Sequence, residues 1–372
     1  MATIAQLLVG RRALTVRWAD GDPSDYPWLW LRDHAHEPET LHPVTQQRQL
    51  FTAGVPADLA GSAAVVRDGV IEVTWADGGR PSELPISFLE RFRTPAPARV
   101  AALPDPVLWD AGSISRDWPT IDHAAVTADD DGVFRWLGEV ARHGFCEVTG
   151  VPREIAATEA LIRRVGYVRE TIFGGMWDFQ ADLAKADTAY TNLELLPHTD
   201  GTYSHDAPGL QLLHCLAFDG TGGESTMVDG FRIAAELRTS SPEHYRTLST
   251  VVVPGQYLGD GAHLVAARPV FRHDHAGALV QVSFNNYDRA PFLLDPDEME
   301  AFYAAVRAFE QLANDPRLQR RRVLQPGHAV LFDNWRVLHG RASYTGHRHL
   351  AGAYVNREDF ESRLRRSAAA RP

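Results

Sequence analysis

The segment LPHTDGTYSHDAPGLQLLHC, residues 196–215, has a histidine and an aspartate two positions apart, ahead of a Pro-Gly turn and an apolar run. On an extended segment, side chains at positions i and i+2 point to the same face, so His198 and Asp200 could bind one metal ion together. A third ligand is then expected from a later strand of the same sheet. The segment GHAVLFDNWRVLHGRASYTGHRHLAGAY, residues 327–354, offers His339 after an apolar strand and a turn.

Two histidines and one carboxylate on one side of a metal leave adjacent coordination positions open, an arrangement typical of non-haem Fe(II) oxygenases. A His-x-Asp pair alone is weak evidence in a chain with 16 histidines. The residues after His339 strengthen the hypothesis, because positions 348, 350, 352 and 354 share one face of a predicted strand. Arg348 and Tyr354 are therefore predicted to face the same side, where the guanidinium could bind a carboxylate through two hydrogen bonds. We expect four other histidines to be ordinary surface or core residues: His205, His214, His347 and His349.

The composition limits the class of protein. The 372 residues carry a net charge of −11, which argues against nucleic acid or an anionic membrane surface as a partner. The longest apolar runs are far too short to cross a bilayer. Cys146 and Cys215 are the only cysteines, so neither a disulfide framework nor a thiolate metal site is expected. We therefore expect a globular protein of the cytoplasm.

The chain is predicted to form two domains. Residues 1–95 are expected to be a small β-rich domain, in which ALTVRWADGDPSDYP (13–27) and VIEVTWADGGRPSELP (70–85) repeat one pattern, each like half of a hairpin. The Pro- and Ala-rich stretch 93–106 predicts a linker. In the second domain, residues 107–372, we expect helices at 131–144, 154–166 and 295–315, and strands at 145–152, 209–218, 225–229, 278–284, 328–332 and 348–355. From residue 187 strands should dominate, with the helix at 295–315 as the one interruption. This order predicts a mainly β catalytic core with flanking helices, a double-stranded β-helix or jelly roll.

Several motifs are shared with one known family. They are WLWLRD (28–33), TQQR (45–48), RETIFGGMW (169–177), DTAYT (187–191), HTDGTY (198–203), TGGES (221–225), VDGF (228–231), NNYDR (285–289) and FDNWRVLHGR (332–341). Together these motifs resemble the γ-butyrobetaine and trimethyllysine hydroxylases. These are Fe(II)- and 2-oxoglutarate-dependent dioxygenases, and the stretch 169–203 is most similar to the trimethyllysine dioxygenases. The resemblance implies a double-stranded β-helix in which His198, Asp200 and His339 bind iron. It also implies that Arg348 binds 2-oxoglutarate with support from Ser225 or Thr221, that O₂ is consumed, that ascorbate stimulates, and that the protein is a homodimer.

The resemblance also implies a substrate pocket. Relatives hold a trimethylammonium group in an aromatic cage, since such a group has no N–H to donate and is bound by ring faces and shape. The matching positions are Phe173, Trp177, Tyr190 and Tyr354. Asp187 matches the aspartate of the trimethyllysine enzymes and could pair with an α-ammonium. An anionic head could be held by Tyr203, Asn286 and Arg289. The best match is a trimethyllysine-like substrate, with γ-butyrobetaine or a trimethylammonium phosphonate as alternatives.

One departure from the family concerns zinc. Many relatives have a site of three cysteines and one histidine just after WLRD, whereas this chain has HAHEPETLHP (34–43) without cysteine. His34, His36, Glu37 and His42 are expected to be solvated loop residues, so we predict no structural zinc.

Two functions of other classes stay open: a metal-dependent hydrolase or isomerase without 2-oxoglutarate, and a non-catalytic quaternary-ammonium-binding protein. Arg348 argues against the first, and the complete ligand set argues against the second.

Overall fold

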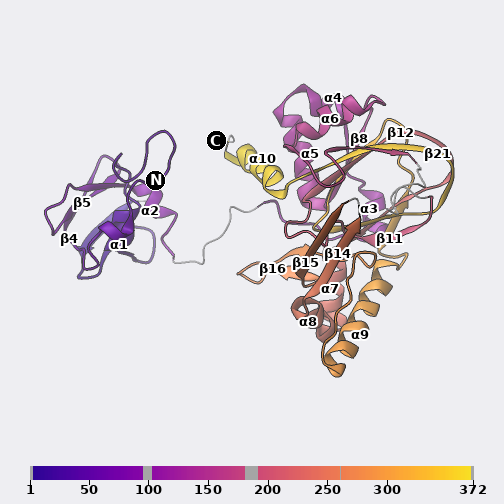
Figure 1. The fold of residues 1–372 in the computed structure, drawn as a ribbon. Helices are drawn as coiled ribbons and strands as arrows, with labels where there is room; N and C mark the ends of the chain where they lie inside the picture. Colours follow the sequence, from indigo (N-terminus) through magenta and orange to yellow (C-terminus); the bar gives the residue numbers. More distant parts are fainter. Residues whose placement is uncertain (1–2, 95–102, 181–191, 260, 370–372) are drawn as a thin grey trace. The chain divides into compact units, whose positions relative to one another are not determined.

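The computed structural model describes residues 3–94, 103–180, 192–259 and 261–369 (Figure 1). The chain divides into two compact units, Met1–Val100 and Ala101–Pro372. Most of the predicted linker at 93–106 lies outside the described residues. None of the helices among the described residues is long and apolar enough to span a membrane.

The first unit contains the same supersecondary structure twice. Its two three-stranded sheets are β1 (Ile4–Val9), β2 (Ala13–Trp18) and β3 (Ser24–Pro27), and β4 (Gly61–Arg67), β5 (Val70–Trp75) and β6 (Ser82–Pro85), followed by the short helices α1 (Trp28–Asp33) and α2 (Ile86–Glu90), respectively. The expectation that each repeated segment forms half of a hairpin was wrong. Each segment forms a whole hairpin, because the Trp-Ala-Asp-Gly turn returns the chain: β2 pairs with β3, and β5 pairs with β6. The indoles of Trp18 and Trp75 close the two hairpins alike, each donating to a serine hydroxyl of the second strand at 3.0 Å.

The second unit is a jelly roll of two sheets. The larger, seven-stranded sheet has the order β10 (Met176–Gln180), β21 (Tyr344–Val355), β12 (Leu210–Gly222), β19 (Ala329–Asp333), β8 (Phe145–Thr149) and β7 (Thr120–Asp122), with β9 (Val168–Arg169) also paired to β21. The smaller, four-stranded sheet has the order β11 (Leu195–His198), β20 (Val337–Arg341), β13 (Ser225–Asp229) and β18 (Gln319–Arg322). The predicted mainly β core is therefore confirmed.

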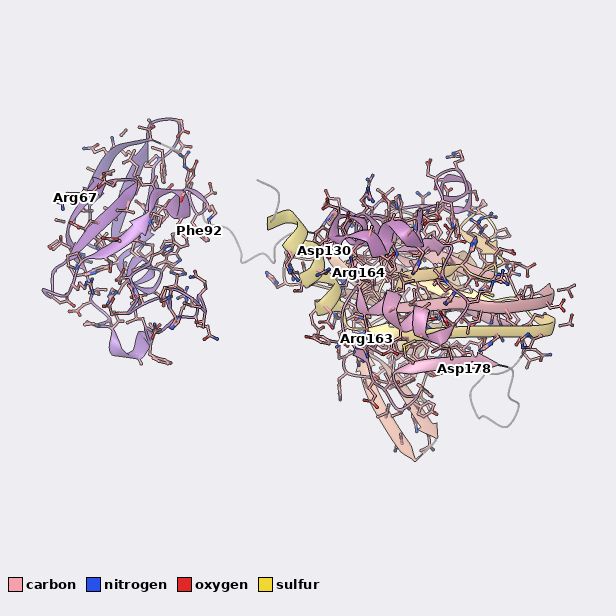
Figure 2. All side chains as sticks on the ribbon, turned by 90° about the horizontal axis from the view of Figure 1, so that it is seen from above. Arg67, Phe92, Asp130, Arg163, Arg164 and Asp178 are labelled. Atoms are coloured by element: carbon pink, nitrogen blue, oxygen red, sulfur yellow. The ribbon has the colours of Figure 1, made fainter. Side chains whose placement is uncertain are left out.

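Alternation along the large sheet separates its two faces. One face packs on the helices α5 (Asp130–His143), α6 (Ile155–Arg163) and α10 (Arg357–Ala369) through Leu210, Leu212, Ala329, Leu331, Ala353 and Val355. The intervening residues point the other way, into a cavity between the sheets: Gln211, Leu213, Val330, Phe332, Leu350 and Tyr354. Ion pairs from Asp130 to Arg164 and Arg363 add links between the helices; Figure 2 labels Asp130 and Arg164. Because Asp130 is half exposed, these pairs contribute little stability.

A second helical layer covers the outer face of the small sheet. Here α7 (Gly230–Ser240), α8 (Pro242–Thr250) and α9 (Pro296–Ala313) form one core with Val228 and Leu338 of that sheet. The helix expected at 295–315 is confirmed as α9. The expectation that it alone interrupts the strands was wrong, since α7 and α8 follow β13. The Asp229 side chain caps α7 by accepting from the Phe231 N–H, whereas α8 begins with Pro242 after Ser241, which makes no side-chain capping bond.

The remaining elements connect or extend these layers. They are the helices α3 (Ala111–Arg116) and α4 (His123–Ala128), the hairpin of β14 (Val253–Gly259) with β15 (Ala262–Arg268), and the hairpin of β16 (Phe271–His273) with β17 (Leu279–Val282).

Candidate active site

Two histidines lie side by side on β11, the first strand of the small sheet, and on its neighbour β20. His198 is the last residue of β11 and is the direct register partner of His339 on β20. As predicted, His339 follows the apolar strand β19 and the turn at 334–336, and it lies on the later strand β20. Asp200 lies in the turn after β11, where Gly201 has φ +72°, a conformation that favours glycine. A Cβ at Gly201 would also lie 2.5 Å from Pro208 Cδ. The Gly in HTDG thus allows the tight turn that brings Asp200 back toward the histidines.

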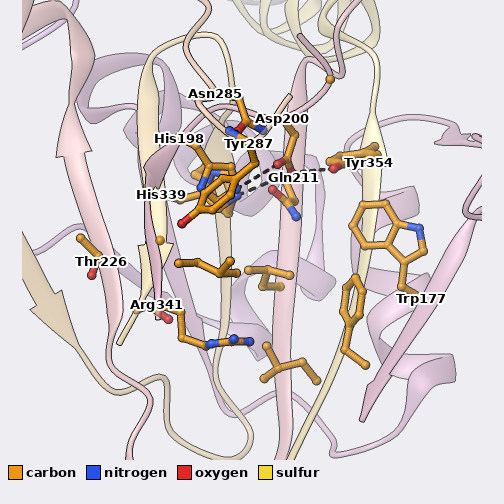
Figure 3. A pocket seen from close by; sticks show the side chains of 18 of the residues that line it. Trp177, His198, Asp200, Gln211, Thr226, Asn285, Tyr287, His339, Arg341 and Tyr354 are labelled. Atoms are coloured by element: carbon orange, nitrogen blue, oxygen red, sulfur yellow. Dashed lines mark hydrogen bonds and ion pairs between the residues drawn. The ribbon is translucent and has the colours of Figure 1, made fainter. Parts of the chain in front are cut away.

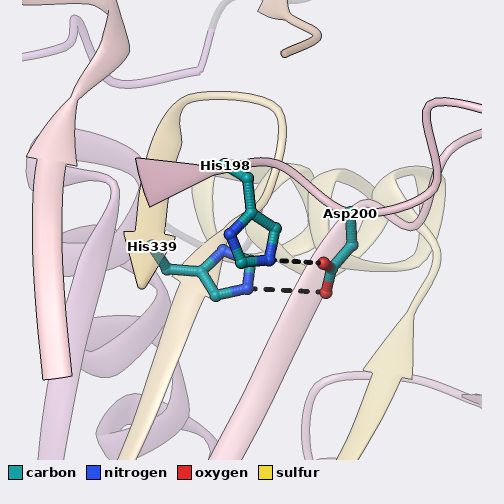
Figure 4. A group of neighbouring side chains, drawn as sticks. All are labelled: His198, Asp200 and His339. Atoms are coloured by element: carbon teal, nitrogen blue, oxygen red, sulfur yellow. Dashed lines mark ion pairs between the residues drawn. The ribbon is translucent and has the colours of Figure 1, made fainter. Parts of the chain in front are cut away.

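The three side chains converge through their ligand atoms (Figure 4). His198 Nε2 lies 3.3 Å from Asp200 Oδ1, and His339 Nε2 lies 3.5 Å from Asp200 Oδ2. The ligand atoms of all three lie within 4.8 Å of one another, and this is the one such group of metal-binding side chains among the described residues. His198 Nδ1 donates to the carbonyl of Leu196 at 2.8 Å, which leaves the Nε2 lone pair for a metal. Two imidazole nitrogens and one carboxylate fit Fe(II) with open positions.

The electrostatics of the group favour a neutral His339 and an ionised Asp200, and they stabilise the protonated form of His198. Burial lowers the pKa of His339 to about 4, so that its imidazole is neutral near pH 7. Burial acts in the same direction on His198, but the hydrogen bond and charge of Asp200 outweigh it and raise that pKa. Burial opposes ionisation of Asp200, yet the two histidines and a hydrogen bond from Tyr354 hold its pKa below the ordinary value. The carboxylate is therefore ionised.

A buried amide holds the turn that carries Asp200. Asn334, in the loop between β19 and β20, accepts from the Asp200 N–H at 2.8 Å and donates to the Asp200 carbonyl at 3.0 Å. It also donates to the carbonyl of Pro208 at 2.9 Å. Two residues later, Arg336 forms a fully buried two-bond ion pair with Asp229, at 3.0 and 2.8 Å. The loop that leads to His339 is thus bonded both to the turn that carries Asp200 and to Asp229 at the end of β13.

Two arginines line the same cavity as the two histidines. Arg348 of β21 and Arg341 of β20 both line it, and in the view of Figure 3 Arg341 lies below the metal-binding group. The Tyr344 ring lies 5.1 Å from the Arg341 guanidinium and 5.6 Å from that of Arg348. Burial, with the nearby charge of Arg341, lowers the pKa of Arg348 to about 10, so it is still cationic near pH 7.

The two candidates for supporting Arg348 differ in position. Ser225 lines the cavity with the arginines. Thr221 is not among the lining residues, and its exposed hydroxyl pairs with that of Thr345 at 2.9 Å.

Aromatic side chains form another wall of the cavity. The Trp177 and Tyr354 rings pack edge to face with centroids 4.2 Å apart, and the Phe173 and Tyr203 rings each lie 5.3 Å from Tyr257. Tyr257 on β14 and Tyr287, 5.9 Å from the His198 ring, were not found from the sequence. Both lie in segments without a clear strand or helix period. Tyr190 and Asp187 lie outside the described residues.

The NNYDR segment contributes different residues from those expected. Asn286 and Arg289 line a separate small cavity and are not among the residues that line the main one. Asn285 and Asp288 line the main cavity instead, where Asp288 Oδ2 accepts from Asn285 Nδ2 at 2.8 Å. These residues lie in a turn, in which alternation along the sequence does not predict the direction of a side chain.

Two known sequence families match the chain. Residues 106–354 match the Taurine catabolism dioxygenase TauD, TfdA family, and residues 6–89 match the family Gamma-butyrobetaine hydroxylase-like, N-terminal. Among solved structures, a putative alpha-ketoglutarate-dependent taurine dioxygenase from Burkholderia xenovorans superposes with a TM-score of 0.48 at 14% identity, over 68% of this chain and 91% of that one.

Relatives that align with most of this chain are named trimethyllysine dioxygenase or gamma-butyrobetaine dioxygenase. The chain is 34% identical to a trimethyllysine dioxygenase of Meyerozyma guilliermondii, over 95% of this chain and 92% of the relative. It is 36% identical to a gamma-butyrobetaine dioxygenase of Pseudomonas sp. strain AK-1, over 94% of this chain and 92% of the relative. Identity to the human mitochondrial trimethyllysine dioxygenase is 33%, over 90% and 80% of the two chains.

Proposed function

Because this chain belongs to the Taurine catabolism dioxygenase TauD, TfdA family, we propose that it hydroxylates a small trimethylammonium compound with Fe(II), 2-oxoglutarate and O₂, and that trimethyllysine is the best candidate substrate. One observation carries the proposal. The His198, Asp200 and His339 group faces a cavity that is also lined by a partly buried arginine, Arg348, and by an aromatic wall. A carboxylate co-substrate and an organic cation could therefore both be held beside one metal.

The residues that line the cavity have different roles in this proposal. His198, Asp200 and His339 would hold the iron, which with 2-oxoglutarate and O₂ supplies the oxidation of an unactivated C–H while 2-oxoglutarate becomes succinate and CO₂. Arg348 binds the distal carboxylate of 2-oxoglutarate through a charge-assisted pair, with the Ser225 hydroxyl beside it. The aromatic wall positions the substrate and so fixes which of its carbons faces the metal. Ascorbate is expected to stimulate turnover by keeping the iron reduced.

The aromatic wall suits a quaternary ammonium group. Such a cation cannot donate a hydrogen bond, so ring faces, shape and desolvation supply its binding, with about 0.5–2 kcal/mol from a cation–π contact. Phe173, Trp177, Tyr203 and Tyr354 supply rings that line the cavity. Tyr190 is proposed as a further member on the strength of its sequence position.

Charge at the other end of the substrate decides between the candidates. Trimethyllysine carries an α-ammonium that γ-butyrobetaine lacks, and Asp288 brings a carboxylate to the cavity wall. Opposite charge there favours trimethyllysine and penalises a substrate whose head is only anionic. Asp187 is proposed as a second partner of the α-ammonium. Relatives of both names have similar identity to this chain, so overall identity does not discriminate.

The test is succinate formation with trimethyllysine, γ-butyrobetaine and a trimethylammonium phosphonate, on wild type, Asp288→Asn and Asp187→Asn. We expect the wild type to prefer trimethyllysine and each variant to lose kcat/KM selectively for it. An unpaired ammonium in a desolvated pocket costs on the order of 2–5 kcal/mol. No succinate with any of the three would reject the proposed substrate class. Equal losses for all three would assign these aspartates a structural role.

Assembly and location are part of the proposal. A homodimer is proposed by analogy with the family, and a monomeric mass in light scattering at micromolar concentration would reject it. A cytoplasmic location is proposed because both cysteines are free and buried, as in a reducing compartment. Cell fractionation tests it.

A further inference from the structure

Tyr354 makes two contacts that belong to different parts of the site. Its hydroxyl donates to Asp200 Oδ2 at 2.5 Å. Its ring packs edge to face on Trp177 with an interplanar angle of 79°. The side chain is buried, and Figure 3 shows it reaching from β21 of the large sheet toward Asp200, which belongs to the small-sheet side.

The hydrogen bond affects how Asp200 can bind a metal. A carboxylate has two oxygens, and one that binds a metal through both takes an additional coordination position. A short hydrogen bond from a hydroxyl to an ionised carboxylate is strong and engages one oxygen. With Oδ2 engaged by Tyr354, Asp200 is biased toward ligation through Oδ1, the oxygen that faces His198. That leaves the remaining positions for the co-substrate and O₂.

The rest of Asp200 is held independently. Asn334 bonds both backbone groups of Asp200, and Gly201 shapes the turn. Loss of the tyrosine hydroxyl therefore frees the carboxylate to rotate without releasing the turn that carries it.

We propose that Tyr354 is a positioning residue for the metal, whose hydroxyl fixes the orientation of the Asp200 carboxylate while its ring forms part of the aromatic wall. The inference rests on the proposed iron site of His198, Asp200 and His339. It separates two functions of one side chain, since Tyr354→Phe removes the hydroxyl and keeps the ring.

The test measures metal binding in the full chain without turnover. Anaerobic titration gives the Fe(II) Kd, and the visible charge-transfer band on adding 2-oxoglutarate reports the ligand arrangement. We expect Tyr354→Phe to weaken Fe(II) about 10-fold, in the range seen when a partner of a metal ligand is removed, and to shift or weaken the band. Trimethyllysine, titrated by fluorescence quenching without metal, should bind with a Kd within about 2-fold of wild type, because the ring still meets the cation.

Two further variants make the result specific. Trp177→Leu should show the reverse pattern, with unchanged Fe(II) affinity and weakened trimethyllysine binding. Tyr245→Phe removes a partly buried hydroxyl on α8, away from the cavity, that contacts Nε2 of His273 on β16 at 2.6 Å. It should leave both affinities unchanged and gives the general cost of such a substitution.

The outcomes separate this inference from the proposed function. Unchanged Fe(II) affinity and an unchanged band in Tyr354→Phe, with Fe(II) binding lost in Asp200→Ala, would overturn the positioning role alone. Retention of Fe(II) by Asp200→Ala would overturn the metal site itself. Equal loss of Fe(II) in Trp177→Leu and Tyr354→Phe would show that the wall acts as a whole and would overturn the role of the hydroxyl.

Discussion

The chain contains two groups of histidine and acidic side chains that look alike in the sequence and differ in the structure. In the first unit, the loop at 34–42 has three histidines and Glu37. There, Glu37 Oε1 accepts from Arg32 and from Ser82, both at 2.7 Å. His42 Nδ1 accepts from the N–H groups of Val44 and Thr45 at 3.2 and 3.1 Å. In the second unit, the Nε2 atoms of His198 and His339 instead point at one carboxylate.

The two groups differ in whether their ligand atoms converge on one point, which among the described residues only His198, Asp200 and His339 do. In the loop, protein donors occupy Glu37 Oε1 and His42 Nδ1. His34 Nδ1 faces the Trp30 carbonyl and its ring stacks on Trp30 at 4.4 Å, so no free nitrogen of the loop is brought to a shared carboxylate. At the jelly-roll site, the backbone takes the other nitrogen of His198 and leaves the metal-facing one. A metal site is therefore defined by where unshared lone pairs converge, and residue composition alone does not establish one.

The largest expected effect distinguishes the two groups directly. His198→Ala, Asp200→Ala and His339→Ala should each abolish succinate formation and tight Fe(II) binding, because each removes one of three ligands. His34→Ala and His42→Ala should leave both near wild type. Iron analysis after dialysis, together with the succinate assay, checks this. Near-normal activity in any of the first three variants contradicts the ligand assignment.

The next effect concerns the co-substrate. Arg348→Ala should raise the KM for 2-oxoglutarate on the order of 100-fold, since a desolvated charged pair loses several kcal/mol when one partner is removed. Fe(II) affinity should stay near wild type. Arg163→Ala, which removes an exposed charge paired with Glu159, is the matched control. An unchanged 2-oxoglutarate titration would place the carboxylate site elsewhere.

A smaller effect is expected from side-chain amides that bond the backbone, one at the metal-binding group and one in the first unit. Asn334→Ala leaves the partly buried backbone N–H and C=O of Asp200 without their partner, at a cost of up to about 1–3 kcal/mol per group. We expect the melting temperature of the second unit to fall by several degrees and Fe(II) affinity to fall with it. Gln49→Ala removes one exposed amide contact to the Pro38 carbonyl in the first unit and should change neither. Calorimetry and Fe(II) titration measure both, and equal shifts in the two variants would contradict the special role of Asn334.

The smallest effect is an expected null result. After dialysis against chelator and reconstitution with iron, the protein should retain at most trace zinc. One equivalent of tightly held zinc would show that the loop at 34–42 can release its protein partners to bind metal, and would erase the distinction drawn above.

Local pattern accounts for what the sequence predicted well. The alternation of β21 places Arg348 and Tyr354 on the cavity side, and the amphipathic pattern of 295–315 appears as α9. Features that depend on distant pairing or on turns were not accessible. The register of His198 with His339 joins strands far apart in the chain, and the direction of Asn285 and Asp288 is set by an irregular turn. The amide of Asn334 was missed because its partners are backbone atoms, which leave no residue pattern to find.

The Asn334 contacts also bear on how readily this scaffold could be retargeted to other amines. These contacts join the turn after β11 to the loop between β19 and β20. Phe173, in contrast, precedes β10, and Tyr257 belongs to the β14–β15 hairpin. A mutational library restricted to Phe173 and Tyr257 would therefore vary the shape of the cavity while the ligand-bearing loops keep their backbone bonds. Selection could then explore bulkier or longer cations without first having to rescue folding, provided that Tyr354 is held constant.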